Sequence, residues 1–249
     1  MKLNNQTIFI TGGGSGIGRG LAEALHQLGN HVIISGRRKT HLAEVTKANP
    51  GMKSVELDIT NPASISQVAA RLIVDFPKLN VLINNAGIML FDDLSVPVDE
   101  TLLLSTINTN LLGPIRMTGG LINHLKQQDS AFVINVSSVL GFVPLAMTGV
   151  YSTTKAALHS YCLSLRYKLK DTPVKVLEIA PPWVRTDLLN STNEPRAMPL
   201  QEFIAEIMAI LATDTPEVLV ERAQRIRNHA GPNEAAFVTQ FNDSLATSV

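Results

Sequence analysis

The sequence predicts one α/β domain in which a doubly wound parallel sheet of about seven strands is flanked by helices. Short β-prone apolar runs alternate with segments of helical periodicity through the first two-thirds of the chain. The runs are apolar throughout rather than alternating, as in strands buried on both faces. A glycine-rich turn separates the first run from the first helical segment. Alternating strands and helices with right-handed crossovers give a doubly wound sheet.

Six of the strands are visible as short apolar runs bounded by turn or helix signals. They cover Thr7–Thr11, His31–Ser35, Met52–Leu57, Leu79–Ile83, Ala131–Val136 and Val174–Ile179. The helices between them are identified by their apolar spacing. The clearest begins at Asn61, a good cap, with Pro62 in its first turn, and it ends before Pro77. Its inward stripe consists of Ile65, Val68, Ala69, Leu72, Ile73 and Phe76.

The remaining helices follow from similar signals. One runs from Ile17 to Leu28, where Gly29 terminates it, and the next contains Leu42 and Val45 and stops before Pro50. Two helices are expected between Pro97 and Lys126. A long helix is expected over 149–170, with Ala157, Leu158, Tyr161, Cys162 and Leu165 facing inward.

The pattern weakens after Trp183. A loop with a short helix is expected over 186–199, followed by helices over 199–212 and 217–228. The last ~20 residues carry no clear pattern. No linker divides the chain, so residues 1–249 form a single domain, and 183–230 is expected to be its substrate-loop region.

Composition excludes several classes of protein. The 249 residues include 21 Lys plus Arg and 21 Asp plus Glu, so net charge gives no case for a nucleic-acid partner. The apolar run 8–10 is too short for a signal peptide, and no segment approaches the ~20 apolar residues of a membrane span. We therefore expect a cytoplasmic protein. The single cysteine, Cys162, rules out an internal disulfide and reads as a buried helix residue.

The glycine-rich turn over Thr11–Gly18 is a candidate phosphate site. Gly12, Gly16 and Gly18 lie between the first strand and the first helix. Without side chains the backbone can approach a pyrophosphate, and the helix N-terminus offers unpaired N–H groups and a positive dipole end. The alternative is a plain tight turn.

Two arginines follow the second strand, at Arg37 and Arg38 after Gly36. A carboxylate at this place would bind a free ribose 2′-hydroxyl, whereas guanidinium groups suit a 2′-phosphate. The sequence therefore favours NADP(H) over NAD(H) as cofactor. The alternative is that both arginines are solvated residues at a helix start.

Tyr151 and Lys155 lie one helical turn apart near the start of the long helix, so both face the same side. Ser138 follows the fifth strand, at the carboxyl edge where doubly wound sheets bind ligands. A free phenol has a pKa of about 10. Two close cations, the Lys155 ammonium and a cationic nicotinamide ring, could lower that pKa by about 3 units, which needs about 4 kcal/mol. Tyr151 would then exchange a proton with a substrate oxygen that Ser138 orients. The alternative is an exposed helical pair and an ordinary loop serine.

Taken together, these motifs resemble the short-chain dehydrogenase/reductase family, of the common type with about 250 residues. The matching residues fall in the family's order and spacing across roughly residues 5–190. They are Thr11–Gly18, Asn84–Gly87, Asn110, Ser138, Tyr151 and Lys155. The resemblance implies a Rossmann-like domain and an oxidoreductase that moves a hydride between a nicotinamide cofactor and a carbonyl or secondary alcohol.

The resemblance also implies individual roles. Asn110 would hold a water in a proton relay that reaches Lys155, and Lys155 would also bind the nicotinamide ribose. Asp58 would contact the adenine edge, with Ile59 beside it. The remaining implied cofactor contacts are Gly12, Ser15, Gly16, Ile17, Gly18, Asn85, Ala86, Gly87, Tyr151, Val184 and Thr186. Without the family, Asp58 could be a helix cap, Asn84 and Asn85 turn residues, and Asn110 the mark of a helix kink.

Two features depart from the family pattern. Pro181, Pro182 and Trp183 stand where Pro-Gly is usual, and Trp183 is expected to wall the substrate pocket. The usual Asp-Gly-Gly-like ending after the seventh strand is absent, which leaves the last strand in doubt. The C-terminal part resembles a branch of bacterial short-chain oxidoreductases encoded near teichoic-acid D-alanylation genes.

No metal site is expected, because the six histidines form neither an HExxH motif nor a cluster with cysteine.

The expected activity is an NADP(H)-preferring interconversion of a carbonyl and a secondary alcohol on a small or medium apolar substrate. The alternatives are a non-catalytic nucleotide-binding protein of the same fold and an epimerase. A homodimer or homotetramer is expected from the family. The helix before the fifth strand is apolar beyond one stripe, so this face could pack on a second copy, and the alternative is simple burial against the sheet. The residues are Leu111, Leu112, Ile115, Leu121, Ile122 and Leu125.

Overall fold

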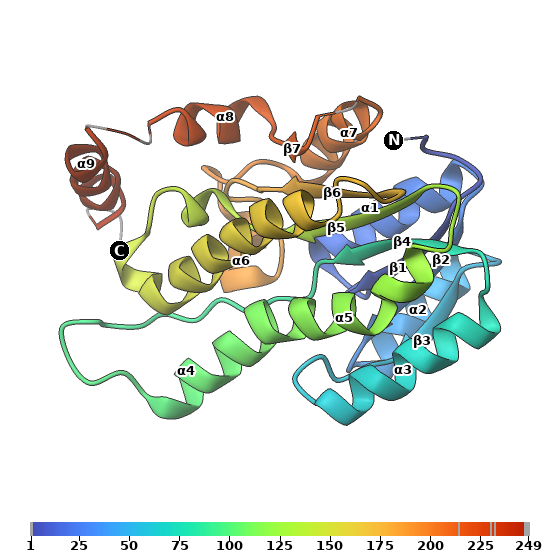
Figure 1. Cartoon of the computed structure of the whole chain (residues 1–249). Helices are drawn as coiled ribbons and strands as arrows, with labels where there is room; N and C mark the ends of the chain where they lie inside the picture. Colours follow the sequence, from blue (N-terminus) through green and yellow to red (C-terminus); the bar gives the residue numbers. More distant parts are fainter. Residues whose placement is uncertain (1, 214, 230, 232, 247–249) are drawn as a thin grey trace.

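The chain folds around one parallel sheet (Figure 1). The computed structural model describes residues 2–213, 215–229, 231 and 233–246. Within these residues seven strands pair in the order β3-β2-β1-β4-β5-β6-β7, and every pair is parallel. The strands are β1 (Thr7–Thr11), β2 (His31–Gly36), β3 (Lys53–Glu56), β4 (Leu79–Asn84), β5 (Ala131–Val136), β6 (Val174–Ile179) and β7 (Glu217–Val218). The predicted doubly wound sheet is confirmed.

Helices connect the strands and cover both faces of the sheet (Figure 1). They are α1 (Gly16–Gln27), α2 (Lys39–Ala48), α3 (Pro62–Asp75), α4 (Glu100–Ile107), α5 (Gly113–Leu125), α6 (Gly149–Lys168), α7 (Leu200–Leu211), α8 (Glu221–Arg227) and α9 (Glu234–Ala246). The Asn61 side chain caps α3 by accepting hydrogen bonds from Ala63 and Ser64, as predicted from its sequence. The two helices expected between Pro97 and Lys126 are α4 and α5, joined by a π-helical turn over Asn108–Leu112.

The core lies in two layers, one on each face of the sheet. Ile8 and Ile10 of β1 pack in the layer with α1 and α7, whereas Phe9 between them packs in the layer with α3 and α5. All three side chains are fully buried. Continuous apolar strands are therefore explained by burial on both sides.

The strand order reverses at β1, which lies between β2 and β4. From β1 the chain proceeds outward to β2 and β3, then returns to β4 and continues outward on the other side to β7. The loops after β1 and β4 therefore diverge at their carboxyl ends and leave a crevice, which is where open α/β sheets bind ligands. The glycine-rich turn follows β1 at this point.

The C-terminal third of the chain differs from the sequence-based prediction at one strand. Residues 217–228 were expected to be helical, but Glu217–Val218 form β7 and pair with Glu178 and Ile179 of β6; α8 begins only at Glu221. A strand of two residues is too short to show a period, so the prediction was wrong there. The helix expected over 199–212 is confirmed as α7.

Helix α9 lies in the part of the chain that carries no clear sequence pattern, and it is anchored to the loop before α6. Asn242 accepts a hydrogen bond from the backbone N–H of Ala146 at 2.5 Å, and its amide donates to the carbonyl of Pro144 at 3.0 Å. None of the helices in the described part of the chain has the length and apolarity needed to cross a membrane.

Candidate active site

The glycine-rich turn has the backbone geometry of an anion site. Gly12 and Gly16 have φ of +68° and +53°, which favour glycine, and a Cβ on Gly12 would lie 2.8 Å from Cα of Ala86. Ser15, the N-cap residue of α1, makes no capping hydrogen bond through its side chain, so it leaves the first-turn N–H groups of the helix to a ligand. These N–H groups and the positive end of the helix dipole can hold a phosphate.

Asn85, which follows β4, holds the glycine-rich turn in place. Its side-chain amide donates to the carbonyl oxygens of Thr11 and Gly12 at 3.0 and 3.1 Å. The Thr11 hydroxyl in turn accepts hydrogen bonds from the backbone N–H groups of Asn85 and Ala86. Asn85 thus joins the carboxyl ends of β1 and β4 and is more than an ordinary turn residue.

The two arginines after β2 extend this anion site. Both side chains are exposed, and Arg38 donates to the hydroxyl of Ser15 at 3.0 Å, which brings its guanidinium next to the start of α1. Ser15 and both arginines line the same cavity. A phosphate bound here would have guanidinium donors on the β2 side and backbone donors on the α1 side.

Tyr151 and Lys155 lie in the first turns of α6 and face the carboxyl end of β5. Nζ of Lys155 is 5.5 Å from the centre of the Tyr151 ring and donates to the carbonyl oxygen of Val136 at 2.8 Å. Both side chains are buried, with 7% and 4% of their surface exposed. Ser138 follows β5 on the same side, so one face of α6 and the end of β5 bring the three predicted residues together.

Burial shifts the pKa values of both Tyr151 and Lys155 in the free chain. Burial raises the pKa of Tyr151 to about 12, and a hydrogen bond with Ser138 offsets only part of that rise. Burial lowers the pKa of Lys155 to about 8, and the nearby Glu178 and Cys162 oppose the decrease. Without the positive charge of a bound nicotinamide, desolvation of the phenolate therefore outweighs its stabilisation, and the predicted lowering of the Tyr151 pKa beside a cofactor stays a prediction.

Asn110 is fully buried in the π-helical turn between α4 and α5. Its side chain accepts from the N–H of Ile88 at 2.9 Å and donates to the carbonyl of Ile88 at 2.8 Å and to Thr154 at 3.3 Å. Its Oδ1 and Nζ of Lys155 both flank Gly87, at 3.4 and 3.8 Å from a Cβ built there. Asn110 fixes the loop after β4 against α6, and both of its amide protons are already used.

Asp58 does not line the cavity, although Ile59 and Thr60 do. Its carboxylate accepts hydrogen bonds from the backbone N–H and the hydroxyl of Thr60, which lower its pKa. The side chain therefore stabilises a local turn before α3, whereas the cap of α3 is Asn61, so Asp58 is not the helix cap that the sequence offered as its alternative role.

One cavity of about 1020 Å³ joins these features. Its lining includes every predicted site residue except Asp58 and Asn110: Gly12, Ser15, Gly16, Ile17, Gly18, Arg37, Arg38, Ile59, Asn85, Ala86, Gly87, Ser138, Tyr151, Lys155, Val184 and Thr186. Trp183 also lines it, as the sequence suggested, and its indole N–H donates to Ser191 at 2.8 Å. The anion site and the tyrosine therefore open into the same space.

Part of the cavity lining is apolar, and sequence reasoning missed several of these residues. Phe91 comes from the loop after β4, Ile226 from α8, and Phe241 and Leu245 from α9. No sequence spacing links these segments to Tyr151. Helix α9 reaches the cavity because Asn242 anchors it to the loop before α6.

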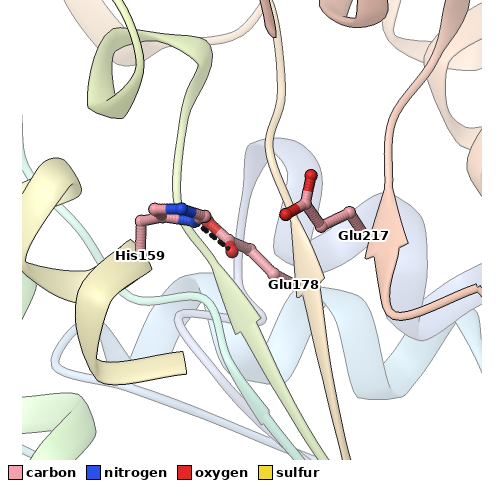
Figure 2. A group of neighbouring side chains, drawn as sticks. All are labelled: His159, Glu178 and Glu217. Atoms are coloured by element: carbon pink, nitrogen blue, oxygen red, sulfur yellow. Dashed lines mark hydrogen bonds and ion pairs between the residues drawn. The ribbon is translucent and has the colours of Figure 1, made fainter. Parts of the chain in front are cut away.

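Three residues with side chains that can ligate metals converge behind the active-site helix (Figure 2). They are His159 on α6, Glu178 on β6 and Glu217 on β7, and their ligand atoms lie within 4.8 Å of one another. His159 Nδ1 is 2.7 Å from Glu178 Oε2, and Arg227 donates to both oxygens of Glu217 at 3.1 and 3.3 Å. The residues thus already have partners and form a charge network rather than an open cation site.

Comparisons with known proteins agree with this geometry. The short chain dehydrogenase family model matches residues 6–197. The uncharacterized oxidoreductase DltE of Bacillus subtilis (strain 168) is 36% identical over 248 residues, which are 97% of this chain and 98% of the relative. An uncharacterized oxidoreductase of Staphylococcus aureus (strain USA300) is 32% identical over 222 residues, which are 88% of this chain and 95% of the relative.

Solved structures agree as well. A short chain dehydrogenase from Burkholderia cenocepacia J2315 in complex with NADP superposes with a TM-score of 0.85 at 26% identity, covering 96% of this chain and 98% of that one. A short-chain dehydrogenase from Streptomyces avermitilis, at 24% identity and a TM-score of 0.83, shares the fold over 98% of this chain and 99% of its own. Family model, relatives and fold together show that this chain is an oxidoreductase of the short-chain dehydrogenase family.

Proposed function

We propose that the chain is an NADP(H)-preferring oxidoreductase that interconverts a carbonyl and a secondary alcohol on a small or medium apolar substrate. The observation that carries the proposal is that Tyr151, Lys155 and Ser138 share one cavity with the glycine-rich turn and the two arginines. The relative from Burkholderia cenocepacia binds NADP, which supports the same cofactor class here.

The residues present fit a dinucleotide phosphate. Backbone N–H groups at the start of α1 and the Gly16 backbone would hold the pyrophosphate, and Arg37 and Arg38 would hold the 2′-phosphate. Lys155, already seated against Val136, would bind the ribose hydroxyls beside the nicotinamide. A bound nicotinamide supplies hydride transfer to or from the carbonyl carbon.

Tyr151 is proposed to move the proton. With its pKa raised to about 12 in the free chain, the phenol carries its proton at neutral pH and is an acid ready for a carbonyl oxygen. Ser138 is proposed to donate a hydrogen bond to the same oxygen and orient it. Asn110 is proposed to support the proton relay in two ways. It fixes the loop after β4, and its Oδ1, which can accept a further hydrogen bond, would bind a water near Lys155.

The substrate class follows from the apolar part of the cavity lining. The proposed substrate region, residues 183–230, contributes Trp183, Leu188, Leu189 and Ile226 to the lining, and the loop before α6 contributes Leu140, Leu145 and Met147. Each methylene placed there is stabilised by about 0.8 kcal/mol, so alkyl or aryl carbonyl compounds should bind better than sugars.

A cofactor titration combined with a panel of aldehydes, ketones and alcohols tests the proposal. We expect NADPH to bind and its absorbance to disappear with apolar ketones or aldehydes. Binding without turnover of any substrate would instead favour a non-catalytic nucleotide-binding protein. Inversion of an alcohol centre with no net change of cofactor would favour an epimerase.

A further inference from the structure

Glu178 is a buried carboxylate on β6, the strand next to the edge strand β7, and it lies beneath the helix that carries Tyr151 and Lys155. Its side chain is 1% exposed, and Oε2 lies 2.7 Å from Nδ1 of His159. Its other oxygen, Oε1, is buried and has no hydrogen-bond partner among the described residues. Leaving a buried acceptor unsatisfied costs about 1–3 kcal/mol, so a functional role would explain why a carboxylate is kept at this position.

Glu178 and Lys155 lie on the same side of the sheet, the side covered by α6. Glu178 pairs with Asn135 of β5, and the Asn135 amide donates to Sγ of Cys162 on α6 at 3.3 Å, while Glu178 meets His159 on the same helix. Both strand side chains therefore face α6. Lys155 lies one turn before His159 on α6, and its ammonium is bound to Val136, the residue after Asn135.

Several charged or titratable groups surround Glu178, from each element packed against it. They are Lys155, His159, Cys162 and Arg166 on α6, Glu217 on β7 and Arg227 on α8. Arg227 pairs with Glu217, and Arg166 donates to the carbonyls of Val176 and Pro216. Burial raises the pKa of Cys162 to about 12, so its thiol is neutral. Among the described residues, Glu178 is thus the negatively charged group that raises the pKa of Lys155.

We propose that Glu178, held by His159, is a positioning residue for Lys155: its negative charge keeps the buried ammonium protonated and seated against Val136. The consequence for catalysis rests on the proposed function, whereas the effect on the lysine itself does not. Because burial lowers the pKa of Lys155 and the charge of Glu178 raises it, removing that charge should release the lysine proton closer to neutral pH.

A nuclear magnetic resonance titration of the free protein tests this directly. Lysine isotope-labelled at Cε reports the protonation of each ammonium, and the signal absent from Lys155→Met identifies Lys155. We expect a midpoint near pH 8 for the wild type. In Glu178→Gln, which keeps the shape of the side chain, the midpoint should fall by about one pH unit. Glu217→Gln is the matched control and should leave it unchanged, because Arg227 rather than Lys155 faces Glu217.

The role of His159 is tested in the same way. His159→Asn places an amide donor near the position of Nδ1 and should preserve the midpoint, whereas His159→Leu frees the carboxylate and should shift it. A midpoint in Glu178→Gln equal to that of the wild type would overturn the proposal. Should that variant fail to fold, an unchanged midpoint in His159→Leu would overturn it instead.

Turnover gives the second measurement. If the wild type reduces a carbonyl with NADPH, the alkaline limb of kcat/KM should move to lower pH in Glu178→Gln and not in Glu217→Gln, whereas a purely structural defect would lower the rate without moving the limb. If the wild type binds NADPH but turns over no substrate, the proposed function fails while the lysine titration still decides the role of Glu178.

Discussion

Oδ2 of Asp92 accepts a hydrogen bond from the backbone N–H of Val150 at 2.9 Å, directly before Tyr151. Oδ1 of the same carboxylate accepts from Gly149, also at 2.9 Å. Asp92 belongs to the loop after β4, and its own N–H donates to the carbonyl of Met147. A side chain from one loop thus caps the helix that carries the proposed acid–base residue and ties both to the rim of the cavity.

Asp92→Ala should therefore affect both stability and turnover. Loss of a cap costs about 0.5–2 kcal/mol, and about 1 kcal/mol lowers the Tm of a chain this long by about 2–4 °C. Turnover should fall further than stability alone explains, because the start of α6 also positions Tyr151. Thermal unfolding and kcat measured at a temperature where the variant is folded check this. Asp93→Ala is the neighbouring control, since Asp93 is exposed and caps only Ser95. Equal kcat in the wild type and Asp92→Ala would contradict the positioning role.

Tyr151→Phe should abolish turnover and leave cofactor affinity intact. The substitution removes only the hydroxyl that would exchange a proton, and loss of general acid–base catalysis typically costs about 10²–10⁴ in rate. We expect no measurable turnover together with an unchanged Kd for NADPH. Tyr167→Phe, an exposed tyrosine on the same helix, should behave as the wild type. Near-normal turnover in Tyr151→Phe would refute the assignment of Tyr151.

Arg37→Ala should weaken NADPH far more than NADH. A hydrogen bond to a charged phosphate is worth about 1.5–3 kcal/mol, so the NADPH Kd should rise roughly 10- to 100-fold while the NADH Kd changes little. Fluorescence titrations with both cofactors measure the two constants. Arg71→Ala, on the exposed side of α3 and paired with Asp75, should change neither. Equal losses for the two cofactors would mean that Arg37 does not read the 2′-phosphate.

The sequence predicted what depends on local pattern, and it failed where distant segments meet. Continuous apolar runs located β1 to β6, and the spacing of Tyr151 and Lys155 together with their place after β5 located the centre of the site. Neither signal carries the burial of the tyrosine, which raises its pKa in the free chain. Asp92 and Phe241 were missed for another reason: their roles depend on tertiary contacts with a segment more than 50 residues away.

The pH dependence of kcat/KM for NADPH should show loss of activity as the pH rises through about 8. Carbonyl reduction needs the phenol of Tyr151, which keeps its proton up to about pH 12, and the ammonium of Lys155, whose pKa is lowered to about 8. The lysine is therefore the group that loses its required proton first. Since kcat/KM reports groups of the free enzyme, its alkaline limb should follow Lys155. A profile that is flat to pH 10 would show that Lys155 is not needed as a cation.

Phe241→Ala should weaken apolar substrates and leave NADPH binding unchanged. Phe241 of α9 lines the apolar part of the cavity, and α9 is held there by Asn242. Loss of a well-packed aromatic contact should cost a bulky ketone about 1–2 kcal/mol, which is a roughly 5- to 30-fold rise in KM, and should spare a short aldehyde that does not reach the ring. The KM values of a homologous ketone series measure this. Val74→Ala, exposed on α3, is the control. If long and short substrates lose affinity equally, α9 closes the cavity without contacting the substrate.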